Sequence, residues 1–490
     1  MKLFQYEKYT KLQIIIVSIA ILVVVNILVS YTSIRFDFSQ GKAYTLAPAT
    51  KKILKNLDDV VTIKLFMSSD LPIALVPLKT DVTDLVGEFK RTSHGKIIVK
   101  TLDPKKDTDA QKEAQTIGLP QIQFSQIEQN NYAVSASFFG IEIMYGAKHE
   151  VIPQATNTDT LEYDITSAIY KMTQKNDIKV GLRGTNQAQS QQGDQFYTLK
   201  TILGKQFQLE NVDVASSSGQ KIDPSIKTVV VVDADNSAFS EQDIQDFKNY
   251  LNNKGQMIFM VDGVYVNDQL QSSEAKHNLF SFFKDYGITL NRNFVLSTQS
   301  EIANFTTSSG AFFTNYPYWI KTSNFATHTP EFSNISLLTF PWAASFDIKN
   351  NTNANVKTLV MSEKNSWVVD NNAILLPDKI ASPDRNTFKK HSVIAEATTK
   401  NGGKLTVIAS SRFAKEQFLA QGRGNISFML NLVNDYASGG ALSGIRSRLV
   451  SVDLIRDAPE SSKDPIKYML IFILPVLIGL YGAHRLVTRK

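Results

Sequence analysis

Hydrophobic positions form two continuous apolar runs near the ends of the chain, and apolar and polar positions alternate between them. The runs occupy residues 14–29 and 468–483, and Ser18 and Asn26 are the polar interruptions of the first. With flanking residues, each run approaches the length of about 20 apolar residues that a helix needs to cross a bilayer. The pattern therefore predicts a membrane anchor near each end and a large body between them.

Basic residues beside the two runs predict how the chain crosses the membrane. They precede the first run and follow the second: Lys2, Lys8, Lys11, Arg485, Arg489 and Lys490. The positive-inside rule then places both termini in the cytoplasm and the body outside the inner membrane. A cleaved signal peptide is the alternative for the first run, but the run is long and no A-x-A site follows it. We therefore expect anchors in residues 1–35 and, after a linker, in residues 446–490.

Residues 36–176 show strand and helix patterns that predict a first α/β domain. The predicted order is βαβαββα, with strands at residues 60–66, 96–102, 138–144 and 148–153 and helices at residues 78–90, 108–117 and 161–172. This order resembles a thioredoxin-like fold in which residues 121–137 are an insertion. Ser68-Ser69-Asp70-Leu71 stands where a thioredoxin carries Cys-x-x-Cys, so we expect recognition or architecture and no redox chemistry.

Residues 177–445 predict a second α/β domain. Near-continuous apolar strands at residues 178–184, 228–236, 256–263 and near residue 404 alternate with helices at residues 196–203, 241–252, 275–286 and 424–437. Such strands are typical of a mostly parallel sheet that is covered on both faces, so we predict a doubly wound sheet. Residues 308–398 break the alternation with aromatic, Asn, Ser and Thr residues, and they predict a β-rich insertion.

Composition limits the classes of function that remain. The chain has 490 residues, of which 43% are hydrophobic and 20% charged, and these are values of an ordinary globular protein. It has no cysteine, which excludes disulfides, thiolate nucleophiles and cysteine-ligated metals. The net charge of +6 is modest and the lysines are scattered, so we expect no nucleic-acid partner.

Catalytic and cofactor motifs are absent from the sequence. Gly402-Gly403-Lys404 lacks the upstream glycine and the following Ser or Thr of a P-loop, so we do not expect ATP hydrolysis. His149-Glu150 is followed by Val-Ile-Pro, which is not the H-E-x-x-H zinc motif, and no G-x-S-x-G elbow occurs. We therefore predict no catalytic residue, no cofactor and no metal site.

Polar residues follow several of the predicted parallel strands. In a doubly wound sheet these positions lie at the carboxyl ends of the strands, where ligands bind. They are Arg183, Asp233, Asp235, Asp262, Ser410, Ser411 and Arg412. The carboxylates can hold a cation and the arginines can hold a carboxylate or a phosphate. The alternative is that these Asp and Ser residues form turns and cap the following helices, and their residue types suit that role.

A run of aromatic residues within the predicted insertion has three interpretations. The run, in residues 311–321, contains Phe312, Phe313, Tyr316, Tyr318 and Trp319. These side chains can belong to a β core, to a surface that contacts a protein partner, or to a platform for sugar rings. Asn26 in the first apolar run is a further candidate for partner contact, because a polar residue in a span can hydrogen-bond to another membrane helix.

Four stretches of the sequence, in order, resemble the GldG family of gliding-motility-associated auxiliary components of ABC transporters. They are residues 36–72, 140–153, 161–169 and 424–450. The resemblance covers nearly the whole chain, and it implies a membrane protein that works with a separate ABC ATPase and a multi-span permease. The loop at residues 184–191 departs from the family, because it reads GTNQAQSQ where a Gly-His-Gly-Glu-like turn is expected. The chain also lacks the fused permease helices that some members carry.

The sequence as a whole predicts a non-catalytic auxiliary subunit that links a permease and an ATPase to an extracytoplasmic protein, glycan or other substrate. One alternative is an extracytoplasmic hydrolase that uses the carboxylates at the strand ends. The other is a protein that binds a small ligand in a polar crevice and delivers it to the permease.

Overall fold

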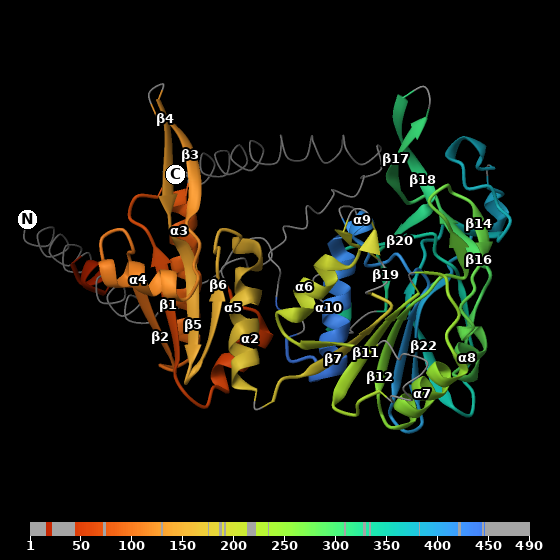
Figure 1. Cartoon of the computed structure of the whole chain (residues 1–490), viewed down its shortest axis with the longest axis horizontal. Helices are drawn as coiled ribbons and strands as arrows, with labels where there is room; N and C mark the ends of the chain where they lie inside the picture. Colours follow the sequence, from red (N-terminus) through yellow and green to blue (C-terminus); the bar gives the residue numbers. More distant parts are fainter. Residues whose placement is uncertain are drawn as a thin grey trace, which may run out of the picture. The chain divides into compact units, whose positions relative to one another are not determined.

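In the computed structural model the chain divides into two units, Met1–Leu46 and Ala47–Lys490. Figure 1 labels the helices and strands of the second unit. The structure describes residues 16–21, 45–71, 75–128, 131–174, 176–185, 189–190, 193–212, 222–233, 235–307, 310–326, 330–332, 335–381, 383–419, 423–442 and 445. Within these residues, no helix combines the length and the apolar character needed to cross a membrane. The predicted apolar run at 468–483, and the run at 14–29 apart from an exposed helical stretch at 16–21, lie outside the described residues.

The first sheet of the body has four strands in the order β2-β1-β5-β6. Strand β1 (Val61–Met67) pairs parallel to β2 (Ile97–Leu102) and antiparallel to β5 (Phe139–Tyr145), which pairs antiparallel to β6 (Lys148–Ile152). A tight turn at Gly146, which adopts a φ of 59°, joins β5 to β6. The buried apolar side chains of β1 and β5 make this sheet the core of the first domain.

Helices connect and cover these strands in the predicted βαβαββα order. They are α3 (Val76–Thr92), α4 (Thr108–Thr116) and α5 (Thr158–Thr173), and α2 (Pro48–Lys55) precedes the first strand. Helix α4 begins where Asp107 accepts a hydrogen bond of 2.9 Å from the Asp109 backbone N–H, which satisfies one of the free donors of the first turn. The predicted insertion forms a separate hairpin of β3 (Ile122–Glu128) and β4 (Asn131–Ser137).

The second sheet begins with five parallel strands in the order β10-β7-β11-β12-β25. Their bounds are Gln208–Asn211, Lys179–Arg183, Ile226–Val232, Gln256–Met260 and Lys404–Ile408. Five of the seven residues in β11 are buried valines or a buried threonine, side chains that favour a pleated strand covered on both faces. The predicted doubly wound arrangement describes this half of the sheet.

The other half of the same sheet is antiparallel. It contains β24 (Ser392–Thr399), β21 (Phe346–Ile348), β22 (Ala354–Met361), β15 (Ile288–Leu290) and β19 (Asn324–Phe325). The short turn at residues 400–403 joins β24 directly to β25, and so short a connection makes neighbouring strands antiparallel. Strands from the predicted β-rich insertion therefore continue the main sheet.

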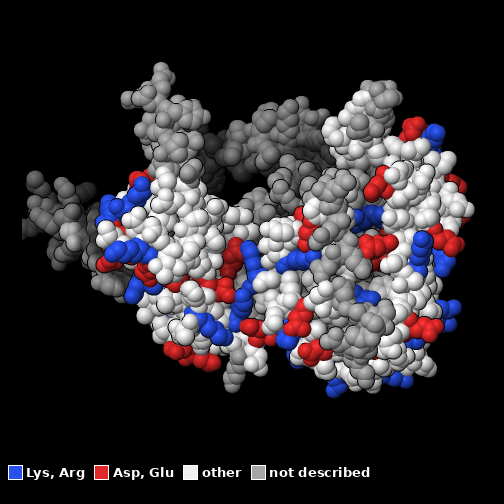
Figure 2. Space-filling model, in the orientation of Figure 1, with Lys and Arg blue, Asp and Glu red and all other residues white. Residues whose placement is uncertain are grey.

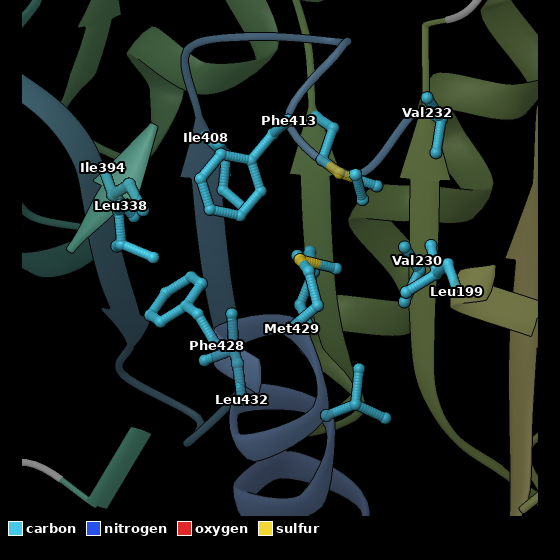
Figure 3. Packing of buried hydrophobic residues seen from close by; sticks show 14 of the residues in the cluster. Leu199, Val230, Val232, Leu338, Ile394, Ile408, Phe413, Phe428, Met429 and Leu432 are labelled. Carbon is cyan, nitrogen blue, oxygen red and sulfur yellow. The ribbon is translucent and has the colours of Figure 1, made fainter. Parts of the chain in front are cut away.

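Helices cover both faces of the parallel half. On one face, α6 (Tyr197–Gly204) and α10 (Arg423–Ser438) pack through side chains that include Phe428, Met429 and Leu432 (Figure 3). On the other face, α7 (Glu241–Asn252) and α8 (Leu279–Asp285) pack through a cluster of aromatic side chains, in which Phe259 and Phe283 lie 5.3 Å apart between ring centroids.

Helix α8 is shorter than the predicted helix at residues 275–286, because residues 272–274 pair as a strand and residues 275–278 are not helical. Small elements complete the described residues: β8 (Gln189–Ser190), β9 (Gly193–Asp194), β13 (Val264–Val266), β14 (Ser272–Glu274), β16 (Asn293–Ser297), β17 (Ser300–Thr307), β18 (Gly310–Thr322), β20 (Leu338–Pro341), β23 (Ser366–Asp370), α9 (Glu416–Leu419), and 3-10 turns at Pro330–Phe332, Pro377–Lys379 and Arg385–Thr387.

Candidate functional site

The order of the parallel strands marks one place in the second domain where ligands typically bind. The chain passes from β7 outward to β10 and then returns to β11 on the other side of β7. In open α/β sheets, the crevice beyond the carboxyl ends of the strands at such a reversal is the usual ligand site. Arg183 ends β7, Asp233 follows β11, and Asp262 and Ser410 stand just after β12 and β25.

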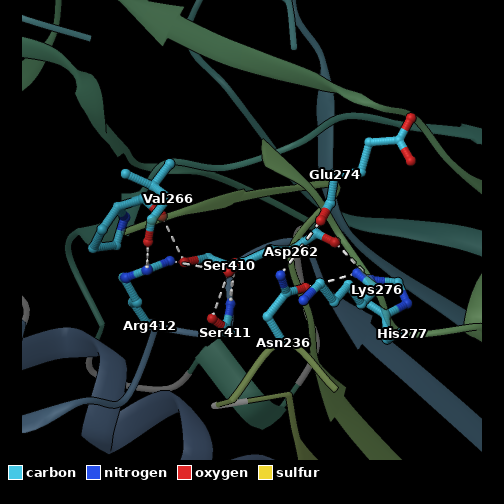
Figure 4. A network of polar contacts seen from close by, with 10 residues as sticks. Asn236, Asp262, Val266, Glu274, Lys276, His277, Ser410, Ser411 and Arg412 are labelled. Atoms are coloured by element: carbon cyan, nitrogen blue, oxygen red, sulfur yellow. Dashed lines mark hydrogen bonds and ion pairs between the residues drawn. The ribbon is translucent and has the colours of Figure 1, made fainter. Parts of the chain in front are cut away.

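Asp262 is the centre of a buried polar network (Figure 4). Its side chain is 1% exposed, and it accepts hydrogen bonds of 2.7 Å from the Ser411 backbone N–H and 2.7 Å from the Ser411 hydroxyl. Arg412 Nη1 donates to the Asp262 carboxylate over 3.0 Å. Three donors therefore compensate the buried negative charge, as a buried carboxylate requires.

Arg412 is enclosed by the same network. Its Nη2 donates to the carbonyl oxygen of Val266, and its guanidinium lies 5.1 Å from the ring centroid of Trp342 and 5.6 Å from that of Tyr265. The positive charge thus has a carboxylate, a carbonyl and two aromatic rings as partners, and the guanidinium is largely committed to this structural network.

Asp233 lies beside this network with an uncompensated carboxyl oxygen. The residue is 4% exposed, and its buried Oδ2 has no hydrogen-bond partner. Burial, followed by the charge of Asp262, raises the pKa of Asp233 to about 7, and Asp235 adds to the increase. The Ser237 backbone N–H and Arg412 act in the opposite direction. This carboxyl group therefore titrates near neutral pH.

Residues that the sequence analysis did not select form the opposite side of the network. His277 is buried, its Nε2 lies 2.7 Å from the Asp262 carbonyl oxygen, and its ring stacks on Phe280 at 4.6 Å. Burial lowers the pKa of His277. Asn236 adopts a φ of 51° and accepts a 2.7 Å hydrogen bond from the Lys276 backbone N–H. The sequence predicts a strand that ends at residue 236, although the tolerance of Asn for this left-handed conformation could have marked a turn. No local pattern marks His277.

Lys415 is a further residue that the sequence analysis missed. Burial, with a smaller contribution from Arg412, lowers the pKa of its amine, while Asp268, Asp262 and Asp235 partly offset that effect. Lys415 follows the end of β25 by several residues, so strand-end spacing alone could not select it.

Two of the predicted residues make their side-chain contacts with other partners. Arg183 Nη2 lies 2.9 Å from Asp243 Oδ2, its Nη1 donates to the Val212 carbonyl over 3.2 Å, and its guanidinium lies 5.2 Å from the Phe239 ring. The Ser410 hydroxyl donates to the Pro341 carbonyl over 2.7 Å. The crevice residues that do come together are Asp233, Asp262, Ser411 and Arg412, with Asp235 close enough to influence the pKa of Asp233.

The chemistry available to these residues follows from their partners. The Ser411 hydroxyl donates to Asp262, and His277 Nε2 faces a backbone carbonyl, so neither is arranged as a serine nucleophile with a histidine base. Among the described residues, no group of three or more His, Asp or Glu side chains is placed to hold a metal ion. On the face that Figure 2 shows, acidic and basic side chains are interspersed.

The aromatic run divides between the core and the surface. Tyr316 is 0% exposed and donates to the Leu375 carbonyl over 2.7 Å, and Trp319 lies 5.5 Å from Trp342 between ring centroids. These positions agree with the core interpretation. Phe312 and Phe313 are exposed. Asn26 lies outside the described residues.

Two family models match this sequence. One, described as an ABC-type uncharacterized transport system, matches residues 177–432. The other, a domain of unknown function (DUF7088), matches residues 40–144. An uncharacterized protein of Borreliella burgdorferi is 24% identical over 494 residues, with 94% of each chain covered.

Solved structures resemble part of the chain. The mmIFT52 N-terminal domain has a TM-score of 0.36 and 14% identity and covers 53% of this chain and 98% of its own. A putative ThuA-like protein from Bacteroides uniformis has a TM-score of 0.32 and 12% identity and covers 56% of this chain and 97% of its own.

Proposed function

Because this chain belongs to the family described as an ABC-type uncharacterized transport system, we propose that it is a non-catalytic auxiliary subunit of an ABC transporter. In this proposal it couples a permease and an ATPase to an extracytoplasmic substrate or partner. The observation that carries the proposal is the family match over residues 177–432, which includes all five parallel strands and the helices on both faces of the sheet. The finer GldG-type assignment is part of the same proposal.

The chemistry of the strand ends supports a role without catalysis. Asp262 and Arg412 are committed to each other and to neighbouring donors and rings, so they stabilise the loops after β12 and β25. Arg183 is committed to Asp243 at the beginning of α7. These contacts support a structural role for the strand-end residues.

The proposal also includes a topology and a role for the first domain. The apolar runs at residues 14–29 and 468–483 anchor the chain in the inner membrane, with both termini in the cytoplasm and the body outside. The first domain is a thioredoxin-like module without cysteines. It therefore supplies a surface for recognition or architecture and takes no part in thiol chemistry.

The test is purification of the tagged full-length chain from its native cells in mild detergent, followed by mass spectrometry. We expect an ABC ATPase and a multi-span permease to co-purify, and to be absent from a parallel purification of the tag alone. Recovery of a monodisperse chain without either component would contradict the proposal. It would favour a self-sufficient enzyme or a small-ligand-binding protein.

One observation favours the alternative of a small-ligand-binding protein. Asp233 is a buried carboxyl group with a pKa of about 7, and such raised pKa values are common in functional sites. Asp233→Asn removes the charge and keeps the size of the side chain. We expect the variant to co-purify with the transporter components and to keep the transport phenotype. Loss of that phenotype with unchanged assembly would favour the small-ligand alternative.

A further inference from the structure

Strands β17 and β18 form a hairpin that stands out from the second domain (Figure 1). The two strands pair from Ser300↔Ile320 to Thr307↔Gly310. The third strand, β20, pairs with β18 only between Trp319 and Thr322. The outer part of the hairpin therefore has no further strand beside it within the described residues of this sheet.

The hairpin has one inner face and one outer face. Cross-strand partners share a face, so Ile302 lies with Asn315, and Asn304 with Phe313, on the outer face. Ile302 is 56% exposed and Phe313 is 72% exposed. The inner face contributes buried Ala303 and Tyr316 to the core. The exposed apolar side chains are therefore not part of the packing that holds the hairpin.

Apolar character continues around the outer end of the hairpin. Phe312 is the neighbour of Phe313 on the strand and points to the opposite face, where it packs against Phe305 at 5.9 Å and remains exposed. Side chains on both faces of this end are thus apolar and accessible. Contact with one flat protein surface would cover only one face, whereas a medium that surrounds the end covers both.

The outer part of the hairpin also lacks charge, whereas Glu301 and Lys321 lie at its base. No Asp, Glu, Lys or Arg occurs in residues 302–320, although 20% of the chain is charged. Moving this segment into a less polar medium therefore requires no desolvation of an ion, which is the largest cost of such a transfer. Asn304 and Asn315 are the exposed polar side chains described here, and such side chains keep their hydrogen bonds in a hydrated interface.

We propose that the outer end of the β17–β18 hairpin inserts into the lipid headgroup region of the membrane that anchors the chain. This inference rests on the proposed anchoring. The 15 residues between the apolar run and residue 45 span at most about 50 Å, at about 3.5 Å per residue, so the start of the body stays close to the bilayer. Such a tether raises the effective concentration of the hairpin at the bilayer, so even a contact of low intrinsic affinity can form.

The depth of insertion is limited by the backbone. Among the described strands, none pairs with either edge of the hairpin near its outer end. Backbone N–H and C=O groups without hydrogen-bond partners are costly in hydrocarbon. Hydrated headgroups can satisfy those groups and still take up aromatic rings, as aromatic residues at membrane interfaces do. The contact therefore involves Phe313, Phe312 and Ile302 at the interface and no spanning segment.

The absence of native cysteine makes a direct test possible, because one introduced cysteine carries the only label. Full-length chain with Phe313→Cys is labelled with an environment-sensitive nitrobenzoxadiazole fluorophore and reconstituted into phosphatidylethanolamine and phosphatidylglycerol vesicles. We expect blue-shifted emission and strong quenching by lipids with a nitroxide near the headgroup. Ile302→Cys, on the same face, should behave in the same way. Ile348→Cys is the matched control, because it is a 37% exposed strand residue of the same domain.

Flotation of the chain tests the anchoring, and the probe at residue 313 tests the hairpin. A chain that floats with the vesicles, with a probe at residue 313 quenched no more than the probe at residue 348, overturns the hairpin proposal and leaves the anchoring intact. Blue-shifted emission without lipid quenching shows burial against protein and also overturns lipid contact. A chain that does not float with the vesicles overturns both, because the tether is then absent.

Discussion

Two buried carboxyl groups at the strand ends of the second domain differ in how far their charge is compensated. Asp262 has three hydrogen-bond donors, whereas Asp233 Oδ2 has none. The spacing of the sequence placed both residues at strand ends but could not distinguish them. The difference depends on Ser411 and Arg412, which are about 150 residues away along the chain and are brought near only by the pairing of β12 with β25.

Asp233 makes stability depend on pH. Its pKa in the folded chain is raised to about 7 from an ordinary value of 3.8, so between these values the folded state holds a proton that the unfolded state has lost. Stability therefore falls as pH rises through that window, and it does not fall further above it. We expect Asp233→Asn to raise the free energy of unfolding by up to about 4 kcal/mol at about pH 8, relative to the wild type. At about pH 4 the substitution should change this free energy little. Denaturant unfolding monitored by tryptophan fluorescence measures both free energies. An equal change at the two pH values would contradict the raised pKa of Asp233.

Arg412 provides the countercharge for Asp262. Replacement by methionine keeps much of the packing against Trp342 and leaves a buried carboxylate without a positive partner. We expect Arg412→Met to lower the free energy of unfolding by about 3–5 kcal/mol. Arg292→Met is the matched control, because Arg292 is exposed and lies over the Phe280 ring, and its loss should cost well under half as much. Similar losses in the two variants in urea titrations would argue against a buried ion pair.

At the scale of elements, a helix begins where the sequence predicts when a strong capping signal marks its first turn. Helix α7 spans the predicted residues 241–252 because Ser240 and Asp243 form a reciprocal cap, with hydrogen bonds of 3.1 and 2.9 Å. Helix α8 has no such cap and starts later than predicted. The antiparallel half of the main sheet could not be predicted, because an alternating pattern predicts a strand but does not indicate which other strand pairs with it.

The cap of α7 provides a test at this scale. Ser240→Ala removes the hydroxyl that accepts from the Asp243 backbone N–H, and loss of such a cap typically costs about 1 kcal/mol. Because Asp243 also holds Arg183, we expect a cost at or above that value. Ser273→Ala, at an exposed strand position, is the control and should change the unfolding midpoint little. A neutral result for Ser240→Ala would show that the cap adds nothing measurable.

For the whole molecule, the main prediction concerns the side of the membrane on which the body lies. Ile98 is an exposed residue of β2, and the chain is free of cysteine, so Ile98→Cys is a clean probe. We expect a membrane-impermeant maleimide to label it in cells whose inner membrane is intact. A cysteine added after Lys490 should react only when that membrane is permeabilised. The reverse pattern would contradict the proposed topology.

The pairing of β25 has a consequence for how the chain is made. This strand lies between β12 and β24, and it is the last strand of the sheet to be synthesised. Until residues 404–408 emerge, the parallel and antiparallel halves have no strand to join them. Pairings between segments so far apart in sequence form slowly. The second domain therefore stays incomplete until nearly all of it has left the ribosome, so its sheet is assembled after most of its synthesis and not during it.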